Sequence, residues 1–174
     1  MLSSRLAGAL VIGRALLAAP KRALLRQMVA FSQTLPRQFR QPLPAMMAQL
    51  TPPPAHAQPA NHQQSMTIHA LAEAEIRQLA DAVAMWHLRS PLGLCLRRSL
   101  LRYHFLRAAQ IPVSIVFGAR LKSSQEGGGI GGHAWLTLHD QPYFEQPADY
   151  QGFVIMVVYP QEPESETEAA LDPD

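Results

Sequence analysis

The segments Ser90-Pro91-Leu92-Gly93-Leu94-Cys95 and His133-Ala134-Trp135-Leu136-Thr137-Leu138 decide how this chain can fold and what it can do. Cys95 is the only cysteine, and it stands where a turn containing proline and glycine leads into a predicted helix over residues 94–110. His133 opens a run of alternating residues that is typical of a half-buried strand. A thiol and an imidazole that meet in space are the minimum for a cysteine nucleophile.

The pattern around these two residues predicts an α+β fold. Apolar residues at helical spacing predict a helix over residues 67–88, and the following helix is apolar around so much of its surface that we expect it to be central. Short runs rich in β-branched or alternating residues predict strands over 113–117, 133–139 and 153–159. The glycine-rich residues 120–132 lack the Lys-Ser/Thr ending of a phosphate-binding loop, so they predict a hairpin connection.

The 174 residues are enough for one domain with extensions. Residues 1–34 alternate apolar residues with arginines and predict a basic amphipathic helical extension, which Pro20 divides. Residues 35–65 contain seven prolines, so we expect a linker without a packed layer. Residues 66–160 form the predicted catalytic domain, and the acidic residues 161–174 predict a disordered tail.

Charge is distributed unevenly along the chain. Residues 1–72 contain seven basic residues and no carboxylate, which leaves three interpretations of the helix at 1–31. It packs on its own domain, it lies on an anionic membrane, or it holds a partner peptide. The lack of acids also suits an organelle transit peptide, and no apolar run approaches the ~20 residues of a membrane-spanning helix.

Other features of the composition bear on location and ligands. A single cysteine excludes an internal disulfide and suits a reducing compartment, so we expect a cytoplasmic protein, membrane-associated if residues 1–31 bind lipid. His56, His62 and His69 have spacings that fit no common zinc site, and we therefore expect no metal. We also expect no nucleic-acid partner.

The setting of Cys95 suits nucleophilic chemistry. It falls in the first turn of its predicted helix, where exposed N–H groups carry partial positive charge and would favour the thiolate. His133 would accept the proton and later return it, and a carboxylate should orient the imidazole. A tight turn after the His133 strand, followed by a return strand that starts at residues 143–145, would bring Glu145 opposite His133. Glu145 is therefore the expected third member, with Asp149 and Asp140 as alternatives. The competing interpretation of Cys95 is a buried structural cysteine.

Three motifs in this order resemble the lasso-peptide biosynthesis B protein family: Leu94–Leu101, Ile111–Gly118 and His133–Leu136. Those bacterial proteins are transglutaminase-like cysteine peptidases that remove the leader from a microcin-type lasso-peptide precursor. The resemblance implies a papain-like core, in which a helix bearing the nucleophile Cys95 packs on a small antiparallel sheet bearing the base His133. Glu145 falls twelve residues after His133, where the family usually carries aspartate.

The resemblance also implies partners. They are the precursor peptide, a separate leader-binding protein and a lasso cyclase, and no cofactor is expected. Two alternatives stay open at this point. A thioester does not distinguish water from an amine, so the same residues could transfer an acyl group as transglutaminases do. The substitution at Glu145 and the glycine insertion would also suit a catalytically inactive adaptor of the same fold.

Overall fold

The computed structural model describes residues 10–13, 15, 18–52, 71–86 and 90–161. Four strands form one antiparallel sheet in the order β3-β2-β1-β4. The strands are β1 (Val113–Leu121), β2 (Ile130–Leu138), β3 (Gln141–Pro142) and β4 (Val154–Tyr159). The helices are α2 (Ala19–Gln38), α3 (Leu43–Leu50), α5 (Glu73–Trp86), α6 (Leu94–Ala108) and α7 (Pro147–Tyr150), with a 3-10 turn η2 (Ser124–Glu126). The α+β prediction is confirmed.

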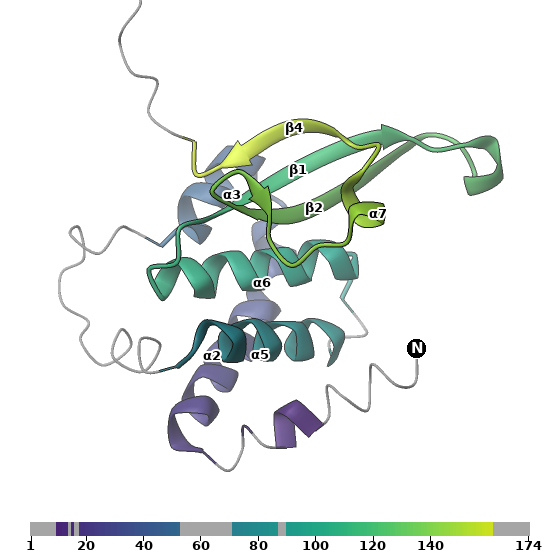
Figure 1. Ribbon diagram of the computed structural model, residues 1–174. Helices are drawn as coiled ribbons and strands as arrows, with labels where there is room; N and C mark the ends of the chain where they lie inside the picture. Colours follow the sequence, from purple (N-terminus) through teal and green to yellow (C-terminus); the bar gives the residue numbers. More distant parts are fainter. Residues whose placement is uncertain (1–9, 14, 16–17, 53–70, 87–89, 162–174) are drawn as a thin grey trace, which may run out of the picture.

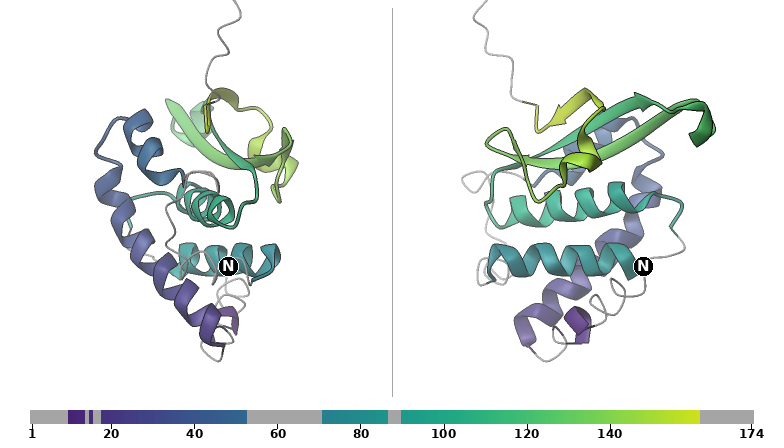
Figure 2. Two further views of the ribbon diagram at one scale, coloured as in Figure 1. Left: turned by 90° about the vertical axis from the view of Figure 1, so that its left-hand side faces the viewer. Right: turned by 45° about the vertical axis from the view of Figure 1, so that its right-hand side comes forward.

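The predicted central helix is central in the structure. In Figure 1 the sheet lies above α6, and α5 lies along the opposite side of that helix. Figure 2 shows α2 running along the flank of both helices, with which it is in contact. Leu100, Leu101 and Leu106 of α6 are fully buried between these layers. Trp86, the last residue of α5, is 65% exposed.

The prediction of an unpacked linker over residues 35–65 is wrong for its first part. Helix α2 continues through Pro36 to Gln38, and α3 buries Met46, Met47 and Leu50 in the main core. Prolines can begin a helix because the first N–H groups have no intrahelical acceptor, and both α2 and α3 carry one in their first turn. Residues 53–65, like the predicted tail at 162–174, lie outside the described residues.

Polar and aromatic contacts fix the N-terminal helices to α6. The ring of His104 stacks on Phe31 at 4.3 Å between centroids, and its Nδ1–H donates to the Leu50 carbonyl at 2.8 Å. The Thr51 hydroxyl donates to a carbonyl of α3, so the Tyr103 hydroxyl donates to Thr51 Oγ1 at 2.8 Å. Within the described ranges, no helix is both long enough and apolar enough to cross a bilayer.

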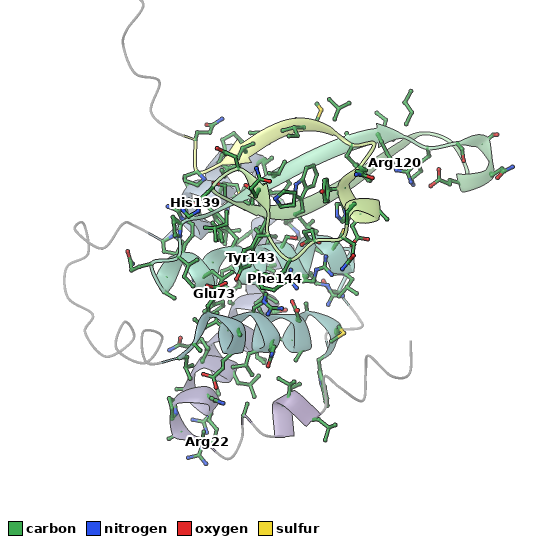
Figure 3. The ribbon with its side chains drawn as sticks, in the orientation of Figure 1. Arg22, Glu73, Arg120, His139, Tyr143 and Phe144 are labelled. Atoms are coloured by element: carbon green, nitrogen blue, oxygen red, sulfur yellow. The ribbon has the colours of Figure 1, made fainter. Side chains whose placement is uncertain are left out.

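The predicted hairpin is confirmed, with longer strands than expected. Strands β1 and β2 pair from Val113↔Leu138 to Leu121↔Ile130, and the glycines between them take positive φ angles at the tip. The return strand expected at residues 143–145 is absent, because β3 ends at Pro142 and Phe144 has a φ of 52°. The chain turns toward α5 instead, where the Tyr143 hydroxyl donates to Glu73 (Figure 3).

Candidate active site

Cys95 and His133 both line a pocket of about 310 Å³. Its walls come from the start of α6, the facing parts of β1 and β2, and the corner between α2 and α3. The lining residues are Phe39, Leu43, Gly93, Cys95, Leu96, Phe117, Gly118, Gly132, His133 and Ala134. The structure therefore brings together the two residues that the sequence indicated for the chemistry.

Cys95 is the second residue of α6 and is half-buried. Gly93 caps the helix, and Cys95 lines the pocket and is not fully buried. The first N–H groups of an α-helix lack intrahelical acceptors, so those of this turn are available to an oxygen atom near the sulfur. This setting is one in which a thiol can act as a nucleophile.

A hydrogen bond close to the pocket fixes α6 against β2. The Ser99 hydroxyl, one turn after Cys95, donates to the backbone carbonyl of Ala134 at 2.7 Å, and both residues are buried. Ala134 follows His133 directly in the strand. The bond therefore sets the distance between the start of the helix and the part of β2 that carries the imidazole.

The His133 imidazole lies in an aromatic environment. Its ring stacks on Trp135 at 5.8 Å between centroids and contacts Phe153 at 5.3 Å. Its Nε2 is buried and has no hydrogen-bond partner in the described part of the chain. Burial lowers the pKa of His133, the positive charge of Arg98 lowers it further, and the charge of Asp149 opposes them. The imidazole is therefore neutral near pH 7 and able to accept a proton.

A glycine in β1 makes room for the aromatic group that supports His133. Gly118 pairs with His133 across the strands, and a Cβ atom there would lie 2.7 Å from the Trp135 ring. Only glycine allows this approach without displacing the ring. Sequence reasoning did not select Gly118, although an isolated glycine inside a predicted strand often marks such a close contact.

Glu145 lies outside the pocket lining and is bound to arginines. Its buried carboxylate accepts hydrogen bonds from Arg98 at 2.7 Å and from Arg102 at 3.3 Å. Arg102 also donates to both oxygens of Asp81 on α5, at 2.6 and 2.7 Å. Burial raises the pKa of Glu145, and the two arginines act against that effect. These contacts connect the segment after β3 to α6 and α5.

The two alternative carboxylates occupy different positions. Asp140 is exposed in the turn after β2, with a φ of 61°. Asp149 lies on α7, is exposed, and raises the pKa of His133 through its charge. The third member of a triad stays a prediction, and the charge of Asp149, which raises the pKa of His133, favours Asp149 over Glu145.

The sequence was compared with models of known protein families, and one of them matches most of the chain. A profile described as "Transglutaminase-like superfamily" matches residues 28–158, from within α2 to within β4. The chain belongs to the transglutaminase-like superfamily. Members of this superfamily include cysteine peptidases and acyltransferases. No curated protein and no solved structure shows a significant match to the chain.

The transglutaminase-like domain includes residues that sequence reasoning assigned elsewhere. The matched region covers the end of α2 and all of α3, and Phe39 and Leu43 from these helices line the pocket. Leu43 stands between Pro42 and Pro44, so the sequence around it was interpreted as a linker and not as part of the pocket. Among the described residues, no group of three histidine, cysteine or acidic side chains could hold a metal ion.

Proposed function

We propose that this chain is a cysteine peptidase that removes the leader from a lasso-peptide precursor, with Cys95 as nucleophile and His133 as base. The shared pocket carries the proposal, because it joins a half-buried thiol at a helix start to a neutral imidazole. The superfamily supports a cysteine-dependent acyl reaction. The three motifs that resemble lasso-peptide biosynthesis B proteins supply the substrate class.

The proposed reaction begins when His133 accepts the proton of the Cys95 thiol. The sulfur attacks the carbonyl carbon of the scissile amide, and the oxyanion accepts hydrogen bonds from the unpaired N–H groups of the first turn of α6. The C–N bond then breaks, and His133 returns the proton to the departing amine. A thioester between Cys95 and the leader remains. Water adds to the thioester through His133 and releases the leader with a free carboxylate.

Asp149 is the carboxylate that we assign to support of the imidazolium. A negative charge near His133 stabilises the protonated ring that forms when the thiol is deprotonated. Glu145, the residue twelve positions after His133, acts in this proposal through its arginine partners. It holds Arg98 and Arg102 in position without contact with the reacting atoms.

Acyl transfer to an amine is the second candidate, because the superfamily includes acyltransferases and both reactions pass through the same thioester. An inactive adaptor is the third. The implied partners are a leader-binding protein, which presents the precursor, and a cyclase, which consumes the released core peptide.

The test combines the full-length chain, its leader-binding protein and the precursor peptide, with products identified by mass spectrometry. We expect separate leader and core masses from the unchanged chain and from a Ser124→Ala control in the exposed hairpin tip. Cys95→Ala should yield neither product while keeping its circular dichroism spectrum. Adding glycine methyl ester distinguishes the candidates, because an acyltransferase would produce a leader that carries the amine. Normal cleavage by Cys95→Ala would exclude Cys95 as the nucleophile.

A further inference from the structure

Most of the residues that line the pocket, besides Cys95 and His133, are apolar. Phe39 and Leu43 approach from the corner between α2 and α3, and Leu96 and Phe117 complete the surface. Of the residues that line the pocket in the described part of the chain, none carries a carboxylate, ammonium or guanidinium group. A charged group placed there would lose its water without gaining a partner.

The size of the pocket limits what it can hold. Its volume of about 310 Å³ is at the lower end of the range of roughly 300–1,000 Å³ that small-ligand sites cover. Such a space accepts one large side chain but not a folded segment of peptide. Three of its lining residues are glycines, and a Cβ atom at Gly93 would lie 3.9 Å from Cys95 Sγ. The available space therefore extends up to the sulfur.

The corner that carries this wall is held by the core. Phe39 lies at the C-terminal end of α2, and its N–H donates to the carbonyl oxygen of Leu35 at 2.9 Å. Leu35 is fully buried. Leu43 begins α3, whose Met46 and Met47 are buried beneath it. Phe39 and Leu43 are themselves only partly buried, so their side chains are available to a ligand while the backbone behind them is fixed.

We propose that this pocket is the subsite for a large, uncharged apolar side chain of the residue whose carbonyl Cys95 attacks. Phe39 and Leu43 are the residues that determine this preference. The inference rests on the proposed function for the role of Cys95. The selectivity of the pocket itself can be measured on the thiol without any peptide substrate.

Because Cys95 is the only cysteine, maleimide labelling of the full chain reports on this pocket alone. The measurement is the ratio of the labelling rates with N-benzylmaleimide and N-methylmaleimide, divided by the same ratio for glutathione. We expect the corrected ratio to favour the benzyl reagent by about tenfold, the scale on which apolar pockets discriminate. Maleimidoacetic acid, which carries a carboxylate, should react more slowly than the methyl reagent after the same correction.

Three variants test which residues carry the preference. Phe39→Ser combined with Leu43→Ser should bring the corrected ratio close to one, whereas Leu121→Ser, at a position that is 82% exposed, should leave it unchanged. Gly93→Ala should slow the benzyl reagent more than the methyl reagent, because its methyl group would occupy space beside the sulfur. A corrected ratio of one in the unchanged chain, or an unchanged ratio in the double variant, would overturn the proposal.

The precursor peptide separates this inference from the proposed function. If the labelling preference is present but the chain neither cleaves nor transfers, the subsite stands and the proposed chemistry fails. If the precursor is cleaved, replacing the residue before the cleavage site by aspartate should lower kcat/KM and replacing it by leucine or phenylalanine should not. Equal cleavage of the aspartate and phenylalanine precursors would overturn the subsite while leaving the peptidase assignment intact.

Discussion

Arg98 donates a hydrogen bond to Glu145 at 2.7 Å, and its positive charge lowers the pKa of His133. One guanidinium thus acts on a buried carboxylate and on the imidazole of the candidate site. The carboxylate serves the contact between helices and the segment after β3, whereas the imidazole faces the pocket that contains Cys95. Glu145 therefore stabilises the structure around the site, whereas Cys95 and His133 would perform the chemistry.

The first prediction distinguishes Glu145 from Asp149. Glu145→Gln removes the charge that offsets two arginines at a fully buried side chain, and breaking a buried pair of this kind costs about 3–5 kcal/mol. Asp149→Asn changes an exposed residue, so its effect on the free energy of unfolding should stay within about 0.5 kcal/mol. Its kcat/KM should fall about tenfold or more, because the carboxylate supports the imidazolium.

Urea unfolding and steady-state cleavage, measured on both variants, check this pattern. The reverse pattern, with Glu145→Gln stable but inactive and Asp149→Asn fully active, would restore Glu145 as the third catalytic residue. Arg102→Lys provides a control for the network, since it keeps a charge beside Glu145 while losing the bidentate contact with Asp81.

The second prediction concerns pH. The ordinary pKa of a histidine side chain is 6.5, and burial lowers that of His133, so the rise of kcat/KM with pH should have its midpoint below 6.5. Arg98→Gln removes a charge that lowers this pKa, and the midpoint should move to higher pH. Asp149→Asn removes a charge that raises this pKa, and the midpoint should move to lower pH.

NMR titration of the His133 ring, assigned with His133→Gln, measures the pKa of His133 directly in both variants. If Arg98→Gln and Asp149→Asn shifted this pKa in the same direction, the opposing roles assigned to Arg98 and Asp149 would be wrong.

A third prediction follows from the contact between Gly118 and Trp135. Gly118→Ala would place Cβ 2.7 Å from the indole ring and 3.1 Å from Phe153 Cβ, so it should destabilise the fold by about 1–3 kcal/mol through overpacking. The indole stacks on His133, so the fluorescence of Trp135, measured in a Trp86→Phe background, and the cleavage rate should change together. Gly132→Ala is the matched control for stability, because the nearest atom to its Cβ is 4.0 Å away. Equal stability of the two variants would show that the ring moves freely.

The fourth prediction concerns helix α3. Met47 is fully buried in the main core, so Met47→Ala should cost about 2–5 kcal/mol of unfolding free energy. Gln49→Ala, on the exposed side of the same helix, should change the free energy of unfolding by no more than about 0.5 kcal/mol. Urea unfolding measures both. If Met47→Ala were as stable as Gln49→Ala, residues 43–50 would not be part of the cooperative core.

The central part of the fold could be predicted because its sequence patterns are strong. Apolar residues around most of α6 indicate a helix buried on several sides, and alternation after His133 indicates a strand. Cys95 and His133 are recognisable from residue type and local context. Their catalytic roles stay predictions, although one pocket contains both.

The rest of the site depends on tertiary structure that the local pattern does not encode. The choice of Glu145 assumed a regular return strand, but β3 stops after two residues and the positive φ of Phe144 redirects the chain. Asp149, whose charge raises the pKa of His133, lies further along on α7. The prolines around Leu43 suggested a linker, yet prolines in a first helical turn are compatible with a buried helix. Phe39 and Leu43 therefore escaped notice as pocket residues.

The corner between α2 and α3 lies far before the nucleophile in the sequence and yet forms part of the wall around it. Phe39 and Leu43 are only partly buried, so substitutions at these two positions change the pocket wall while leaving the thiol, the imidazole and the sheet in place. Under the proposed function, substitutions at this corner would let related chains accept different peptides while keeping one reaction. An evolutionary survey restricted to the neighbourhood of Cys95 and His133 would overlook that diversification.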